Sequence, residues 1–150
     1  MIPTMKFVPV LNSSTMNSGG TATYTTSALD TSGYDSIFFI IKFGAIAATG
    51  AATLSALLKG SDTDSAYTTI TGGGYVYDAT LPASCAVIGG SDDNKCLVLG
   101  YKKVQDPKKY LQVVFSSATA ADIVIESVIA VLVGPQLEPP TTVASFFITN

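Results

Sequence analysis

The sequence predicts an all-β protein: a two-sheet antiparallel β-sandwich of jelly-roll type with extended N- and C-terminal arms. Three observations lead to this prediction. About eight apolar stretches between Thr21 and Val133 have the period-two pattern or the β-branched content of strands. Turn-forming residues separate these stretches at intervals of about eight to fifteen residues. Strands and helices do not alternate along the chain, as they would in a parallel sheet. An immunoglobulin-like sandwich is the alternative, but it usually supplies a buried Trp, and this chain has none.

The length of 150 residues fits one domain with its own core. We expect an N-terminal arm at 1–20, a β-sandwich domain at 21–134 and an extended C-terminal tail at 135–150. The arm begins with an apolar alternation and ends in Asn, Ser and Gly residues that are typical of a connector. The tail begins with a proline-rich stretch and ends in a strand-like apolar segment, 143–149. That segment either packs on its own sandwich or adds a strand to a neighbouring subunit.

The first half of the predicted sandwich contains strands at 21–27, 37–43 and 53–59. The strand at 37–43 is apolar on both sides, so its second side needs cover from a crossing segment or a neighbouring subunit. Its two sides carry Ile37, Phe39, Ile41 and Phe43, and Phe38, Ile40 and Lys42. Residues 37–58 are too interrupted by Gly and Thr for a membrane span and predict a hairpin around an Ala-Thr-Gly-Ala turn.

The second half contains short apolar pieces at 67–70, 75–77 and 85–88, followed by three clearer strands. In the first two of these, alternate residues share one face: Leu97, Leu99 and Tyr101, and then Leu111, Val113 and Phe115. Residues 123–133 form the strongest pattern and predict a central strand. Strict alternation places Ile123, Ile125, Ile129, Val131 and Val133 on one side of it, opposite Val124, Val128, Ala130 and Leu132.

Composition argues against most catalytic mechanisms. The chain has no His and no Arg, so a Ser or Cys nucleophile would lack an imidazole base and a metal site would lack its commonest ligand. We therefore expect that the protein is not an enzyme and binds no cofactor. A net charge of −3 argues against nucleic-acid binding, and we expect no nucleic acid and no membrane as partners. Charged residues make up only 13% of the chain, which indicates a surface that is partly covered in an assembly.

Several possible sites have simpler structural explanations. Cys85 and Cys96 would face each other in a regular hairpin, yet two reduced, buried thiols are the favoured interpretation in a chain without a secretory signal. The acidic turns at 62–65 and 92–94 resemble fragments of calcium loops but lack the rest of that motif, and turn capping explains them. Glu126 is the one candidate for a glycosidase acid, and we expect it to face solvent or a subunit boundary.

The candidate interface residues lie in the arms and in a lysine-rich turn. Four of the eight lysines bracket residues 104–107, where they form either a dock for an acidic protein surface or a solubilising turn. Deleting 1–11 or 143–150 is expected to weaken attachment to a partner while the sandwich stays folded. The full predicted interface set is Phe7, Val8, Val10, Leu11, Lys102, Lys103, Lys108, Lys109, Phe146, Phe147 and Ile148.

Four segments resemble small structural proteins of tailed bacteriophages, most closely the capsid decoration, or cement, proteins. They are Leu29-Asp-Thr-Ser-Gly-Tyr-Asp-Ser36, Leu57-Leu-Lys-Gly-Ser-Asp-Thr-Asp-Ser-Ala-Tyr67, Lys109-Tyr-Leu-Gln-Val-Val-Phe115 and Ile129-Ala-Val-Leu-Val-Gly-Pro135. The resemblance covers about residues 21–140 and rests on short turn-and-strand patterns. The apolar tail departs from the family's pattern.

The resemblance implies a jelly-roll sandwich on the outside of an icosahedral phage head. Such a protein binds as a homodimer or homotrimer where subunits of the major capsid protein meet, and it stabilises the shell against internal DNA pressure. The implied location is the outer capsid surface of the virion, after assembly in the host cytoplasm. A tail or fibre component, or a receptor- or carbohydrate-binding β-sandwich, is the alternative. The family has no catalytic residues to transfer to this chain.

Overall fold

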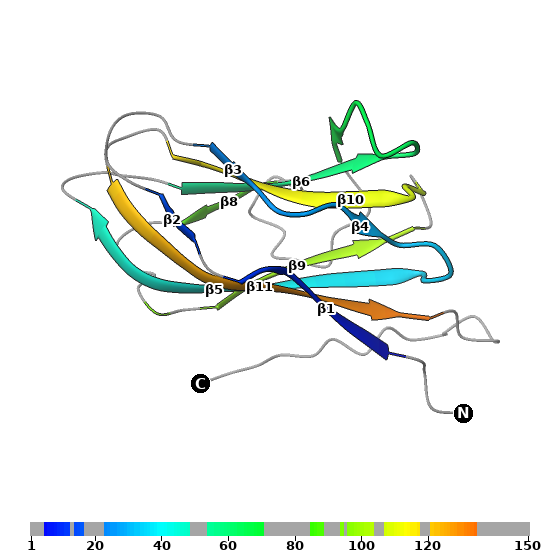
Figure 1. Ribbon diagram of the computed structural model, residues 1–150, viewed down its shortest axis with the longest axis horizontal. Helices are drawn as coiled ribbons and strands as arrows, with labels where there is room; N and C mark the ends of the chain where they lie inside the picture. The colour runs from blue at the N-terminus through cyan, green and yellow to red at the C-terminus, as the bar shows by residue number, and fades with distance from the viewer. Residues whose placement is uncertain are drawn as a thin grey trace.

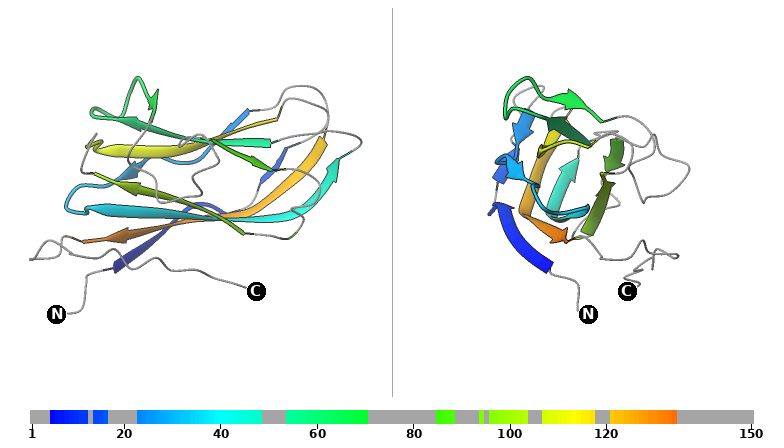
Figure 2. Two further views of the ribbon diagram at one scale, coloured as in Figure 1. Left: turned by 180° about the vertical axis from the view of Figure 1, so that it is seen from behind. Right: turned by 90° about the vertical axis from the view of Figure 1, so that its right-hand side faces the viewer.

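The computed structural model describes residues 5–12, 14–16, 23–48, 54–70, 85–88, 94, 96–103, 107–117 and 121–134. These residues form two antiparallel β-sheets that pack face to face, and no helix occurs among them (Figures 1 and 2). The predicted all-β sandwich is therefore confirmed. Within the described chain, no helix is long and apolar enough to cross a membrane.

Sheet A contains the two longest strands, each of 13 residues, at its centre. Its strand order is β1-β11-β5-β9, and β2 also pairs with β11. Its strands are β1 (Met5–Leu11), β2 (Ser14–Met16), β5 (Ser36–Ala48), β9 (Cys96–Lys102) and β11 (Ala121–Val133).

Sheet B has the order β3-β10-β6-β7, with β4 paired to β10 and β8 paired to β6. Its strands are β3 (Thr23–Thr25), β4 (Leu29–Asp30), β6 (Leu54–Ser61), β7 (Thr68–Thr69), β8 (Cys85–Ile88) and β10 (Tyr110–Ser117).

The order of strands is that of a jelly roll. The chain passes from β1 in sheet A to β3 and β4 in sheet B, returns to β5, and then crosses to β6. After β8 it crosses to β9, to β10 and finally to β11, which pairs with β1. Strands that follow each other in the sequence therefore mostly lie in different sheets, and the first and last strands are neighbours.

The core lies between the two sheets. It is built from alternate side chains of the long strands, whose opposite neighbours are more exposed. Its largest fully buried side chains are Tyr101, Phe39, Phe43, Phe115, Ile37, Ile41, Leu54, Leu58, Leu111, Ile123, Ile125 and Leu132. The predicted inner faces of 37–43, 97–101 and 111–115 are confirmed, because every residue assigned to them is buried in the core.

The predicted hairpin at 37–58 is wrong. β5 pairs with β9 and β11 in sheet A, whereas β6 pairs with β10, β7 and β8 in sheet B. The apolar alternation of both strands was read correctly, but alternation specifies which side of a strand is buried and not which strand it pairs with. Here the two consecutive strands lie in different sheets (Figure 1).

The geometry proposed for Cys85 and Cys96 is wrong for the same reason. Cys85 lies on β8 opposite Leu57 in sheet B, and Cys96 lies on β9 opposite Lys42 in sheet A. The two residues are not cross-strand partners. Cys96 is a free thiol, as predicted, but it is exposed rather than buried.

Strand β11 is central, as predicted, but its sides change over in the middle. Ile123 and Ile125 point into the core, and further along Val128, Ala130 and Leu132 do so. The register with β5 shifts between Ile125 and Ser127, so β11 carries an extra residue there. Such a β-bulge reverses the alternation. The predicted grouping of Ile123 and Ile125 with Ile129, Val131 and Val133 is therefore wrong.

The remaining predicted segments have mixed outcomes. The strand predicted at 21–27 is shorter, because β3 ends at Thr25 and regular pairing resumes at β4. Residues 5–11, at the start of the predicted arm, form β1 and pair with β11. The piece at 75–77 and the tail at 135–150 lie outside the described residues.

Candidate protein interface

The outward side of sheet A is an apolar surface that spans four strands. In a paired antiparallel sheet, directly opposed residues point to the same side. The register places Phe7, Val131 and Phe38 in one row across β1, β11 and β5. The next row contains Pro9, Ile129, Ile40 and Val98 and so extends to β9, and Met5 pairs with Val133 in the row before them.

We call this surface the outer face. It is defined by Met5, Phe7, Pro9, Phe38, Ile40, Val98, Ile129, Val131 and Val133. None of these nine side chains carries a charge or a hydrogen-bonding group.

The outer face is exposed mainly along β1. Phe7 is 65% exposed, Met5 is 51% exposed and Ile129 is 36% exposed. Phe38 and Ile40 are half-buried, and Val131, between Phe7 and Phe38 in the same row, is buried. Every described strand belongs to one of the two sheets, so no described strand crosses this face (Figure 2).

An antiparallel sheet that meets water on one side normally places polar side chains there. This sheet has apolar residues on both sides. A contiguous apolar patch of this kind marks a contact site. The structure therefore identifies the second apolar side that the sequence of β5 predicts, and shows that it continues onto β1, β11 and β9.

Charged side chains occur at the two ends of the outer face. At one end, the Lys42 ammonium group donates a hydrogen bond to the Glu126 carboxylate, and both side chains are largely exposed. This hydrogen bond and the charge of Glu126 raise the pKa of Lys42. At the other end, Lys102 follows on the outward side of β9 and is half-exposed.

Glu126 owes its position to the bulge in β11. A Cβ atom on Gly44 would lie 3.0 Å from Glu126 Oε1, so the glycine leaves the space that this side chain occupies. Glu126 is exposed and paired with a cation rather than placed in an apolar pocket. This environment agrees with the solvent-facing position expected for it.

The predicted lysine cluster lies at one end of the sandwich, and three of its members have partners within the chain. The Lys103 ammonium group donates a hydrogen bond to Thr31 O at 2.7 Å, and burial lowers the pKa of Lys103. Lys108 Nζ lies 3.4 Å from Asp62 Oδ2. Lys109 Nζ lies 5.0 Å from the centre of the Tyr110 ring.

Carboxylates offset much of the positive charge at this end. Hydrogen bonds from Ser32 lower the pKa of Asp30, and the charges of Lys109 and Lys103 lower it further. Asp35 acts on the pKa of Lys103 in the same way that Asp30 does, by favouring its charged form. The arrangement fits a solubilising, internally balanced turn more closely than a dock for an acidic surface.

The predicted interface residues of β1 divide between the two sides of the strand. Phe7 lies on the outer face. Val8 packs against the core, and Val10 and Leu11 are buried in it. The outer face therefore includes Phe7 and leaves the other three residues to the sandwich itself. Phe146, Phe147 and Ile148 lie outside the described residues.

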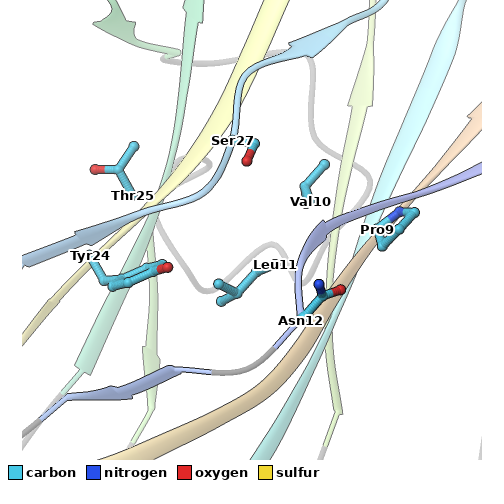
Figure 3. A pocket seen from close by; sticks show the side chains of 7 residues that line it. All are labelled: Pro9, Val10, Leu11, Asn12, Tyr24, Thr25 and Ser27. Atoms are coloured by element: carbon cyan, nitrogen blue, oxygen red, sulfur yellow. The ribbon is translucent and has the colours of Figure 1, made fainter.

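A pocket lies between β1 and β3, at the open edge of the sandwich (Figure 3). It has a volume of about 330 Å³ and is lined by Pro9, Val10, Leu11, Asn12, Tyr24, Thr25 and Ser27. The Ser27 N–H donates a hydrogen bond to Val10 O at 3.2 Å and so joins the two sheets beside it. None of the lining residues is charged, and Tyr24 is the sole aromatic residue among them.

The acidic turn at 62–65 is closed by its own hydrogen bonds. Ser61 Oγ accepts hydrogen bonds from the N–H groups of Thr63 and Ser65, each at 3.3 Å. The Tyr67 hydroxyl donates to the Asp64 carboxylate, and burial together with this bond raises the pKa of Tyr67 to about 12. These contacts are those of a capped turn. Among the described residues, no group of three or more Cys, Asp or Glu side chains is placed to hold a metal ion.

Comparison with known proteins gives little support for a specific family. No family model and no curated protein matches this chain. Among solved structures, the chain is similar to a chain in the structure of the infectious bursal disease virus Gt strain, with 11% sequence identity and a TM-score of 0.31. The match covers 95% of this chain and 43% of the viral chain, so this chain spans less than half the length of that neighbour. The neighbour is a viral protein, but a likeness this weak carries no argument about function.

Proposed function

We propose that this chain is a structural virion protein that binds the outside of an icosahedral phage head and stabilises contacts between major capsid protein subunits. The observation that carries the proposal is the outer face of sheet A. A module with a complete core of its own has no need of a second apolar surface for folding, so this surface serves contacts with other molecules. The resemblance of the sequence to decoration proteins supplies the particular assembly.

The jelly-roll fold is compatible with this role but does not decide it, because one fold can host many functions. The composition adds support. A chain with 13% charged residues presents few groups whose desolvation would oppose burial in an assembly. The chain also lacks His and Arg, so the proposed role is structural rather than catalytic.

The proposed mechanism is additive. Each copy contacts more than one shell subunit, or another copy that does so. Every contact buries apolar surface, which contributes a free energy of about 25 cal/mol per Å², less the cost of ordering the groups involved. Many copies together raise the free energy needed to separate neighbouring shell subunits. No bond is made or broken in this process.

The experiment that tests the proposal is quantitative mass spectrometry of purified virus particles, which gives the copy number of this chain relative to the major capsid protein. We expect a simple ratio close to the abundance of the capsid protein. A few copies per particle would contradict the proposal and favour a tail or neck component. Absence from particles would contradict any virion role and favour a receptor- or carbohydrate-binding module.

A further inference from the structure

We propose that the outer face of sheet A binds residues 143–149 of a second copy of this chain, so that copies are joined by exchanged C-terminal segments. This inference deepens the proposed function, because it names the partner that covers the outer face. It also stands on its own as a statement about self-association, and it can be tested without capsid shells.

The first argument is chemical complementarity. The nine side chains of the outer face are uncharged, and among the described residues the charged groups beside it lie at its ends, at Lys102 and at the Lys42–Glu126 pair. The segment 143–149 reads Val-Ala-Ser-Phe-Phe-Ile-Thr and contains no charged residue. Phe146, Phe147 and Ile148 are anchor side chains of the kind that dominate protein interfaces. The face and the segment are therefore matched in polarity.

The second argument is size. Four strands spaced at about 4.8 Å and three alternating rows at about 6.8 Å give the outer face roughly 20 Å by 20 Å, or about 400 Å². A stable interface buries about 800 Å² on each partner. Two bare outer faces packed together fall short of this area, whereas a dimer with mutually exchanged segments has two separate face–segment contacts. An extended segment of seven residues is about 23 Å long and thus fits the length of the face.

The third argument is the direction in which the chain leaves the sandwich. Val133 lies in the end row of the outer face, and its carbonyl oxygen accepts a hydrogen bond from the Asp35 N–H at 3.1 Å, which fixes the exit of β11. Among described glycines, only Gly33 has a positive φ, so Gly134 does not make the left-handed turn with which a glycine often reverses a chain.

The residues that follow supply a spacer between the sandwich and the apolar segment. The stretch 135–142 carries three prolines, at 135, 139 and 140, and prolines favour an extended backbone of about 3.1 Å per residue. Eight such residues reach about 25 Å, which exceeds the length of the outer face. A spacer of this length is long enough for the apolar segment of one copy to reach the outer face of another.

The first test compares the full chain with a variant that ends at Gly134, by sedimentation velocity without capsid shells. We expect the full chain to form a dimer or larger oligomer and the shortened chain to be a folded monomer with a similar thermal midpoint. A monomeric full chain would overturn the proposal, and so would a shortened chain that forms the same oligomer.

The second test examines the face. Phe7→Ser and Ile129→Ser remove side chains that are exposed in the single copy, so their effect on folding is small and their effect on the oligomer is direct. We expect each to raise the dissociation constant of the oligomer roughly tenfold or more. Lys6→Ser is the matched control, because Lys6 is exposed but points to the other side of β1. Equal effects of the three substitutions would contradict the proposal.

The third test separates exchange between copies from folding back. In a chain whose two native cysteines are replaced by Ser, Phe7→Cys and Phe147→Cys are combined, and the protein is oxidised. Exchange predicts disulfide-linked dimers or larger species on a non-reducing gel, which each single-cysteine variant fails to form in comparable yield. An internally linked monomer, or no link, would overturn the proposal. Particle-bound but monomeric protein would leave the proposed function standing without the exchange.

Discussion

Thr26 is a buried polar residue that completes the hydrogen bonding of sheet B where β3 ends. Its N–H donates to Val113 O, and its hydroxyl oxygen accepts from the Val113 N–H, each at 3.0 Å. A side chain thus takes the place of the backbone carbonyl that a regular strand would supply. Thr26 is only 4% exposed, so water is not available as a substitute partner.

We predict that Thr26→Val lowers the free energy of unfolding by about 1 to 3 kcal/mol, because it keeps the shape of the side chain but leaves the Val113 N–H buried without an acceptor. Urea denaturation followed by circular dichroism measures this change. Thr26→Ser is the control, since it retains the hydroxyl group, and it should lose markedly less. A Thr26→Val variant that lost no more stability than Thr26→Ser would contradict the role given to the hydroxyl acceptor.

Residue-level burial could be predicted from the sequence wherever a strand is regular. On β5, Ile37, Phe39 and Ile41 are all fully buried, as strict alternation requires. Polar residues with local partners were also interpreted correctly, as in the turn that Ser61 closes. Single side chains that replace a missing backbone partner, such as Thr26, could not be foreseen, because their role depends on a strand far away in the sequence.

At the scale of elements, the β-bulge in β11 shows where alternation fails as a guide. The pattern of residues 123–133 is apolar on both sides, so alternation alone does not show where the sides change over. Glu126 and Ser127, the two residues that dilute the apolar run, lie at the bulge itself. Two consecutive polar residues inside an apolar strand were therefore the available signal of a bulge.

Strand β1 connects the predicted interface with the stability of the sandwich. Its outward residues, Met5 and Phe7, are exposed on the outer face, while Val10 and Leu11 are buried in the core. β1 also pairs with β11 along most of its length. The two sides of one strand thus carry two separate functions, and a deletion of the strand affects both.

We predict that deleting residues 1–11 destabilises the sandwich by about 3 to 6 kcal/mol, because two buried aliphatic side chains are lost at about 1.5 to 3 kcal/mol each. The structure therefore changes the expectation that the sandwich stays folded without this segment. Thermal unfolding monitored by circular dichroism measures the loss. Deleting 135–150 is the matched control and should leave the midpoint nearly unchanged; an equal loss in both variants would contradict this account of β1.

At the scale of the whole molecule, the jelly-roll order makes the fold strongly non-local. Met5 pairs with Val133, 128 positions later in the chain (133 − 5). Most connections cross between the sheets, so few pairs of strands can form as local hairpins. Loop closure over such distances is costly in entropy before any contact compensates for it.

We predict that the chain refolds on a timescale of milliseconds to seconds, as β-sandwiches with non-local pairing do. Stopped-flow dilution from urea, with tyrosine fluorescence as the probe, measures the rate. Refolding in microseconds would contradict the non-local order of strands. The same measurement on the chain that ends at Gly134 is the control, because that chain keeps every described strand.

The fold class, the architecture and most strands could be predicted from the sequence, but the pairing of strands could not. Periodicity reports the environment of each side chain, and pairing depends on which strands meet across the core. The same limit applies to the candidate interface. The apolar second side of β5 was recognised, but its continuation onto Phe7 and Ile129 required the register of sheet A.

The pairing of Met5 with Val133 also has a mechanical consequence. The described chain enters and leaves sheet A at the same end, on two adjacent antiparallel strands. A force that pulls these ends apart acts along the hydrogen bonds and not along the strands, so it opens the β1–β11 pairs one after another, starting at Met5. If the protein is held at both ends and pulled, β1 separates from β11 first. The strands of sheet B bear no force at this stage.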